Sequence, residues 1–138
     1  MSSSRHSAVA SKRREHSIRA DLARLKEARD FAERAAMEFG LPSHACYQVK
    51  LALSEAVTNA IQHGSSSPDD PVRIFISQEA GSLVFEVLDT GRFVPRVRRR
   101  GDMPESGRGL EFMRLMMDTV ELDPGDDGTR LRLVKRLQ

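Results

Sequence analysis

The chain has 138 residues, of which 39% are hydrophobic and 30% charged, as expected for one folded domain with a core of its own. Its 22 basic and 20 acidic residues leave a net charge of only +2, so no strong overall field points to nucleic acid. No apolar run reaches the ~20 residues of a membrane span, and residues 1–6 lead into no apolar core of a signal peptide. Cys46 is the only cysteine, which excludes an internal disulfide and fits a reducing compartment. We therefore expect a cytoplasmic protein that is not inserted in a membrane.

The first part of the sequence predicts a tail, a strand and a helix. Residues 1–14 are rich in Ser and Arg without periodicity and are expected to be disordered, ahead of a domain that spans residues 15–138. Residues 15–20 predict a short edge strand. A helix is expected from Asp21, its N-cap, to Phe39, because apolar residues recur between them at three- and four-residue steps.

A second helix carries the polar side chains that first point to a site. Ser43 is placed to cap its first turn, and Gly64 is expected to end it with a positive φ angle. Glu55, Asn59 and His63 lie four residues apart, so they form one line along the border of the apolar stripe, away from open solvent. The stripe itself consists of Val49, Leu53, Ala56, Val57, Ala60 and Ile61. Such a line suits a site for a metal-bound anion, although polar residues with no common role explain the same spacing.

The C-terminal half predicts four strands. The strand pattern occurs in residues 72–77 and 82–88, which flank a Gly81 turn, and again in residues 119–122 and 129–135. Leucine and arginine alternate in the last of these strands, so one of its faces is expected in the core and the other in water.

The segments between the strands complete the expected fold. A long loop is expected over residues 89–109, a short helix over residues 110–117 and a turn over residues 123–128. Together the elements predict an α+β domain, a two-layer sandwich in which a mostly antiparallel sheet carries helices on one face.

Two glycine motifs flank the expected loop. Asp89-Thr90-Gly91 directly follows a strand, so it presents a carboxylate beside backbone that a ligand can approach closely. Gly107-Arg108-Gly109-Leu110 precedes the expected helix, whose first amides and dipole favour a phosphate group. Each motif alone is weak, since turns and helix starts commonly contain such residues.

The order of these features is more specific than any one of them. A helix with Glu55, Asn59 and His63 is followed by the motif at Asp89, the glycines before Leu110 and a last strand that opens with Gly128-Thr129. This order resembles the Bergerat-fold ATPases, the superfamily of gyrase, sensor histidine kinases and anti-sigma-factor serine kinases.

The small size of the chain and the sequences of residues 53–60 and 110–118 narrow the resemblance to one branch of this superfamily. Over residues 15–138 the sequence is similar to the anti-sigma-factor serine/threonine kinases, which have a histidine-kinase-like ATPase domain. The resemblance implies ATP and Mg²⁺ as cofactors. It also implies two protein partners, a sigma factor and an anti-anti-sigma protein of the STAS type, and a homodimer.

The resemblance implies a role for each matching residue. Glu55 is expected to be the base at an attacking hydroxyl, and Asn59 to bind Mg²⁺. Asp89 is expected to accept a hydrogen bond from the adenine amino group. The other residues that the resemblance places around ATP are Gly91 and Thr129 beside adenine, His63 at the pocket edge, and Gly107, Arg108, Gly109 and Leu110 at the phosphates.

One position departs from the family pattern. The first glycine motif of the family usually reads D-x-G-x-G, and Phe93 stands at its second glycine. Phe is less permissive than Gly, so the hinge of the ATP lid is expected to be stiffer. Arg96, Arg98, Arg99 and Arg100 lie in the same lid, where phosphate, a protein partner and water are all open as their contacts.

These features leave three functions open. Glu55 and Asn59 favour an ATP-dependent serine/threonine protein kinase. Phe93 favours a nucleotide-binding module that sequesters a partner without phosphoryl transfer. A nucleic-acid-binding domain built on the Arg96–Arg100 loop has little support, because aromatic residues make up only 5% of the chain.

Overall fold

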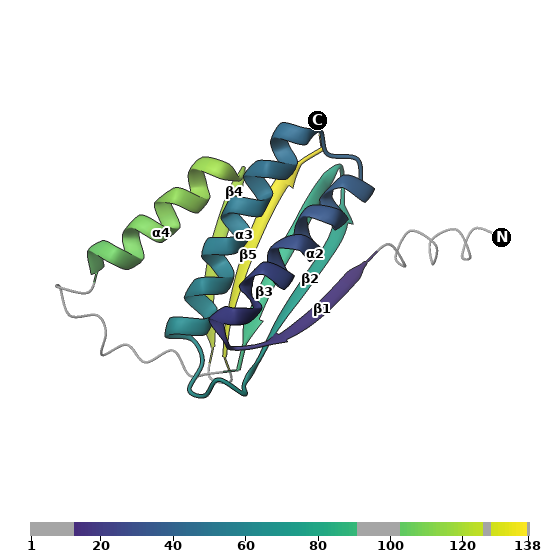
Figure 1. Ribbon diagram of the computed structural model, residues 1–138. Helices are drawn as coiled ribbons and strands as arrows, with labels where there is room; N and C mark the ends of the chain where they lie inside the picture. The colour runs from purple at the N-terminus through teal and green to yellow at the C-terminus, as the bar shows by residue number, and fades with distance from the viewer. Residues whose placement is uncertain (1–12, 91–102, 126–127, 138) are drawn as a thin grey trace.

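The computed structural model describes residues 13–90, 103–125 and 128–137. Five antiparallel strands form one sheet in the order β1-β2-β3-β5-β4, and the helices lie on one of its faces (Figure 1). The elements are β1 (Arg14–Arg19), the 3₁₀ turn η1 (Leu22–Arg24), α2 (Leu25–Glu38), α3 (Ser43–His63), β2 (Pro71–Glu79), β3 (Ser82–Asp89), α4 (Met103–Met116), β4 (Thr119–Gly125) and β5 (Gly128–Arg136). This arrangement confirms the two-layer α+β fold class. None of the described helices has the length and apolar composition needed to cross a lipid bilayer.

The first strand starts one residue earlier than expected. Arg14 is the first residue of β1, and its guanidinium lies 3.4 Å from a carboxylate oxygen of Glu38. Arg13, just before the strand, lies 4.3 Å from the centre of the Phe75 ring. These two contacts tie the basic residues to the sheet and to α2. The rest of the predicted tail, residues 1–12, lies outside the described residues.

The strand and cap predicted before the first helix are confirmed. β1 is an edge strand whose antiparallel register with β2 sets Ile18 opposite Val72, and both side chains are buried. The carboxylate of Asp21 accepts a hydrogen bond from the backbone amide of Ala23 at 3.0 Å. Because the first turn after this cap is 3₁₀, the α-helix begins only at Leu25.

A sharp break separates α2 from α3. Gly40 has a φ angle of 102°, a conformation that glycine adopts readily and that ends α2. Pro42 takes the N-cap position of α3 with φ −68° and ψ 162°, and Ser43 is the first helical residue. The prediction that Ser43 caps this helix is therefore wrong, because Ser43 lies one position past the cap.

Helix α3 is the central helix of the helical layer, with α2 on one side and α4 on the other (Figure 1). The apolar stripe predicted for it is buried except for Ile61, which is half-buried. Beneath the helices lie fully buried side chains of the sheet, including Ile74, Phe85 and Leu133. Burying a side chain of this size contributes roughly 1.5–3 kcal/mol, so α3 is held firmly against the sheet.

The C-terminal elements differ most from the predicted ones. Helix α4 begins at Met103, about two turns earlier than predicted. Strand β4 continues to Gly125, which pairs with Gly128 of β5, so residues 123–125 and 128 of the predicted turn belong to strands. Pro124 fits within β4 because this strand lies at the edge of the sheet. On the open side of an edge strand no neighbouring strand requires a backbone amide as hydrogen-bond donor.

The face of the sheet without helices is charged, as the alternation in the last strand predicted. Arg132 of β5 stands between its register partners Glu86 of β3 and Glu121 of β4. Its guanidinium lies 4.0 Å from Glu86 and 3.7 Å from Glu121. Leu131 and Leu133 point the other way and are buried in the core.

Candidate functional site

The end of β3 and the start of β5 form a buried polar corner. Asp89 and Thr129 are register partners, and the backbone amide of Thr129 donates a hydrogen bond to Asp89 Oδ1 at 3.2 Å. Among the described residues these are the polar side chains that lie buried with the core, at 7% and 9% exposure. The Thr129 hydroxyl has no hydrogen-bond partner within the described residues. A buried hydroxyl in this condition suits a ligand that supplies the missing partner.

Gly64 brings the end of α3 to the same corner. A Cβ atom on this glycine would lie 2.0 Å from Asp89 Oδ2, far inside contact distance. The positive φ angle predicted for Gly64 is wrong, since φ is −104° and the amide still bonds to the Ala60 carbonyl at 3.1 Å. Gly128 approaches from the other side, where a Cβ atom would lie 2.0 Å from the Asp89 carbonyl oxygen. Glycine is needed at these two positions because the Asp89 residue fills the space beside them.

A second polar cluster lies further back along α3. Glu55 and Asn59 are half-buried, as expected for residues at the border of the apolar stripe. They face Gly109 of α4, where a Cβ atom would lie 3.3 Å from both Glu55 Oε2 and Asn59 Nδ2. Neither polar side chain has a hydrogen bond or ion pair to another residue in the described part of the chain. Asn59 and Gly64 are separated by about 7.5 Å of helix axis, so the two clusters are neighbours along one helix.

His63 does not share this environment. It is the last residue of α3 and its side chain is exposed. The expectation that all three residues of the line avoid open solvent is therefore wrong for His63, which lies at the exposed end of the helix.

The second glycine motif lies inside a helix. Gly107 and Gly109 belong to the second turn of α4, whereas the sequence placed them ahead of it. The free amides of an α-helix belong to its first four residues, so in this arrangement the amides of Gly107, Gly109 and Leu110 belong to the helix interior. Leu110 is half-buried and packs against the core. Gly91, Phe93 and the arginines at 96 and 98–100 lie outside the described residues, as does the side chain of Arg108.

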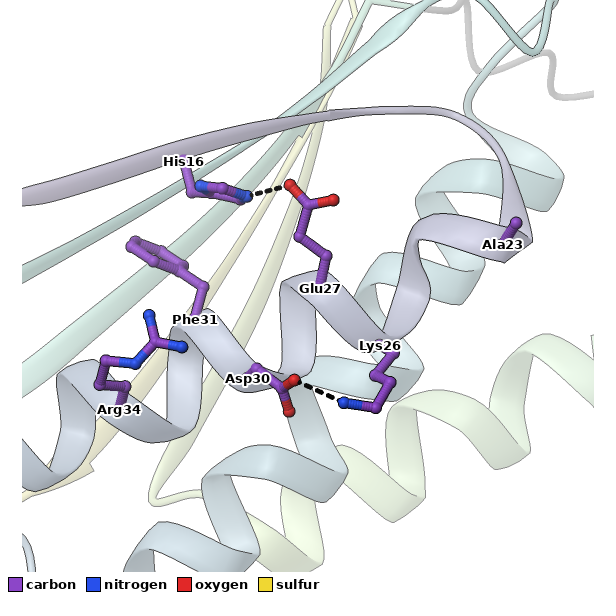
Figure 2. A pocket seen from close by; sticks show the side chains of 7 residues that line it. All are labelled: His16, Ala23, Lys26, Glu27, Asp30, Phe31 and Arg34. Atoms are coloured by element: carbon purple, nitrogen blue, oxygen red, sulfur yellow. Dashed lines mark hydrogen bonds and ion pairs between the residues drawn. The ribbon is translucent and has the colours of Figure 1, made fainter.

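The structure also has a hollow of about 450 Å³ that no sequence motif predicted, between β1, η1 and α2 (Figure 2). Two pairs form among its polar side chains: His16 Nε2 lies 2.6 Å from Glu27 Oε2, and Lys26 Nζ donates to Asp30 at 2.9 Å. The hydrogen bond from Lys26 lowers the pKa of the Asp30 carboxyl. None of the predicted site residues lines this hollow, so we place the functional site at the two clusters along α3.

Comparison with known proteins shows the family of the domain that carries both clusters. The family model described as the histidine kinase-like ATPase domain matches residues 18–135. The chain belongs to this family. The histidine kinase-like ATPase domain therefore accounts for nearly the whole described chain, and both clusters lie within it.

Curated relatives place the domain in the anti-sigma-factor branch. It is 34% identical over 98 residues to an anti-sigma F factor of Clostridium botulinum (strain Eklund 17B / Type B), a match that covers 64% of this chain and 68% of the relative. An anti-sigma F factor of Bacillus velezensis is 32% identical over 100 residues, covering 65% of this chain and 68% of the relative.

Solved structures share the fold. The crystal structure of the RsbU and RsbW domains of a Mycobacterium tuberculosis protein superimposes with a TM-score of 0.70 at 17% identity, over 91% of this chain and 32% of that chain. The blue-light activated histidine kinase of Erythrobacter litoralis EL346 superimposes with a TM-score of 0.57 at 27% identity, over 70% of this chain and 32% of that chain. This chain spans about a third of the length of each of these two structures.

Two features of the site escaped sequence analysis. The bond from the Thr129 amide to Asp89 depends on strand register, which the pattern of single strands does not contain. The packing of Gly64 against Asp89 joins residues far apart in the chain. The only signal for it was a glycine directly after the polar line of α3, and that signal was interpreted as a helix stop.

Proposed function

We propose that this protein is an ATP-dependent serine/threonine protein kinase of the anti-sigma-factor type. It would bind Mg-ATP and a sigma factor, phosphorylate an anti-anti-sigma protein of the STAS type, and act in the cytoplasm as a homodimer. The observation that carries this proposal is that Glu55 and Asn59 both lie beside Gly109. Both side chains are half-buried and have no bonding partner within the described residues. The names of its relatives support the sigma factor as a partner.

The corner at Asp89 fits an adenine ring. A carboxylate accepts a hydrogen bond from an amino group more strongly than a neutral oxygen does. The unpartnered Thr129 hydroxyl offers a second polar contact in the same buried place. Gly91 is assigned beside the base, and His63 at the outer edge of the pocket.

The cluster at Asn59 fits a metal-bound phosphate. An amide oxygen is a hard ligand of the kind that Mg²⁺ accepts, and Mg²⁺ commonly takes its remaining ligands from phosphates and water. The described residues contain no group of three or more His, Cys, Asp or Glu side chains that could hold a metal without such help. Asn59 would therefore be one protein ligand of a metal that ATP carries.

The phosphate contacts proposed for α4 require a rearrangement. Gly107, Gly109 and Leu110 are assigned to the phosphates through their backbone amides, and Arg108 through its charge. Because α4 begins at Met103, these amides become free only when the first turns of the helix unwind. Glycines in those turns lower the cost of unwinding by roughly 1 kcal/mol each relative to alanine.

Glu55 is assigned to the acceptor side of the reaction. ATP, when bound, supplies the phosphoryl group. Glu55 would take the proton of the serine or threonine hydroxyl as that oxygen attacks, while Asn59 holds the metal that offsets the phosphate charge.

A second function keeps the same nucleotide site without the reaction. Phe93 in place of a glycine favours a stiff lid, so the protein would bind ATP or ADP and sequester its partner without phosphoryl transfer. Retention of Glu55 favours the kinase, because a carboxylate near the phosphates only repels a nucleotide that does not react.

One assay separates the two functions. The tagged chain is used to recover its partners from the extract of its own host, and each recovered protein is then incubated with radiolabelled ATP and Mg²⁺. Label on a serine or threonine of a STAS-type partner is expected, and the Asn59→Ala chain should give none. Binding of Mg-ATP and partner without label would support the alternative, and failure to bind Mg-ATP would contradict both.

A further inference from the structure

Gly64 is a glycine whose backbone does not require glycine. Its φ and ψ angles of −104° and −7° belong to the right-handed region that any residue adopts. Its amide continues the helical hydrogen bonds of α3 by donating to Ala60 at 3.1 Å. Helix-ending glycines commonly have positive φ, and Gly64 does not. The reason for a glycine must therefore be the space beside its α-carbon.

The Asp89 carboxylate occupies that space, and its other contacts oppose a shift away from Gly64. A Cβ atom at Gly64 would lie 2.0 Å from Oδ2, 2.4 Å from Cγ and 2.9 Å from Oδ1. Rotating the carboxylate away would break the bond from the Thr129 amide to Oδ1. The Asp89 backbone is closely packed as well, since a Cβ atom at Gly128 would lie 2.0 Å from its carbonyl oxygen. The carboxylate is therefore held between the end of α3 and the start of β5.

We propose that Gly64 is a positioning residue that sets nucleotide specificity by leaving Asp89 Oδ2 in place to accept the amino group of adenine. This inference rests on the proposed function. Because Gly64 has no side chain, the Asp89 carboxylate can stay beside it and accept the hydrogen bond from the Thr129 amide. A purine that carries an oxygen at the same ring position, as in inosine triphosphate, presents an acceptor to this carboxylate and is rejected.

The contact is tested without nucleotide by a double-mutant cycle. Gly64→Ala, Asp89→Ala and the double variant are compared by thermal unfolding, with Gln62→Ala, an exposed residue in the last turn of α3, as control. Gly64→Ala should lower Tm in the natural chain and lower it much less in the Asp89→Ala chain, because the atoms that the new methyl group meets are gone. If Gly64→Ala alone does not fold, folding of the double variant supports the contact. An equal loss in both backgrounds, or failure of both to fold, overturns the proposal.

Specificity is tested by titrating the chain with Mg-ATP and with Mg-inosine triphosphate. The natural chain and Gln62→Ala should prefer ATP, and Gly64→Ala should reduce that preference by about ten- to a hundredfold, as expected for one hydrogen bond to a charged acceptor. A change that is merely structural would weaken both nucleotides alike and leave their ratio unchanged, which overturns the proposal. Equal binding of the two nucleotides by the natural chain also overturns it. If the natural chain binds neither nucleotide, the proposed function fails, and the unfolding cycle still decides the contact.

Discussion

Gly109 of α4 rests directly on Glu55 of α3, so that a Cβ atom on the glycine would lie 3.3 Å from Glu55 Oε2. The same atom would lie 3.3 Å from Asn59 Nδ2. Both distances are slightly shorter than an ordinary contact between a carbon and its neighbour. The helix that carries the second glycine motif therefore covers the two side chains to which we assign the metal and the reacting hydroxyl.

Gly109→Ala should separate stability from nucleotide binding. Alanine stabilises a helix interior by about 1 kcal/mol relative to glycine, and mild crowding costs about the same, so the free energy of unfolding should change little. Mg-ATP binding should weaken on the order of tenfold, because the methyl group takes space beside Asn59. Urea unfolding and calorimetry measure the two effects, with the exposed Glu111→Ala of the same helix as control. Unchanged Mg-ATP affinity in Gly109→Ala would contradict this assignment of α4.

Glu55 and Asn59 should fail in different ways. Glu55→Ala should lower phosphoryl transfer by ~10²–10⁴-fold, the usual contribution of a general base, and leave ATP affinity nearly unchanged. Asn59→Ala should lose both Mg-ATP binding and transfer, because it removes a ligand of the metal. A transfer assay beside a binding titration distinguishes the two. Loss of ATP affinity in Glu55→Ala as large as in Asn59→Ala would rule out the proposed division of roles.

Lys135 anchors the far end of α4. Its ammonium donates to the carbonyl of Met116, the last residue of the helix, at 2.5 Å and to Gln48 Oε1 of α3 at 2.7 Å. Lys135→Met should lower the free energy of unfolding by about 1–3 kcal/mol, because two acceptors lose a charged donor in a half-buried place. Arg136→Met, the next residue along β5, should stay within ~0.5 kcal/mol of the natural chain. Equal effects of the two substitutions in urea unfolding would count against the anchor.

Cys46 should be inert in the folded protein. Its side chain is 2% exposed, and burial raises the pKa of the thiol above its ordinary value of 9.0. Because the folded pKa lies above the unfolded one, the thiol leaves the free energy of unfolding at its full value below pH 9.0. That free energy falls as the pH rises through the folded pKa. Ellman's reagent at neutral pH should therefore label the unfolded chain quickly and the native chain slowly. Labelling of the native chain at the rate of the unfolded chain would show that the thiol is accessible.

Local patterns in the sequence predicted most of the sheet. The alternation around Phe85 predicted the hairpin of β2 and β3, because apolar side chains at every second position can face only one layer. Ile18 and Asp21 likewise carry local signals for an edge strand and a helix cap. The combination of Glu55, Asn59, Asp89 and Thr129 was predicted as a site because a family pattern joined what local patterns left separate.

At two of the mispredicted positions, contacts distant in sequence override local preference. Gly107 and Gly109 favour a loop by propensity, yet α4 extends through them where Gly109 packs on Glu55. Gly64 is the predicted end of α3, but its φ angle is negative, and the Asp89 carboxylate beside it explains why the residue is a glycine. Ser43 has good cap chemistry, but Pro42 occupies the cap position first.

The most direct test of the account is calorimetry of Mg-ATP binding to the purified chain and to its Asp89→Asn variant. The natural chain should bind Mg-ATP at one saturable site, and removal of Mg²⁺ should weaken that binding. Asp89→Asn should lower the affinity by about tenfold or more, because a neutral amide is a poorer acceptor than a carboxylate for the adenine amino group. No binding by the natural chain, or equal affinity in the Asp89→Asn variant, would contradict the placement of the nucleotide at Asp89.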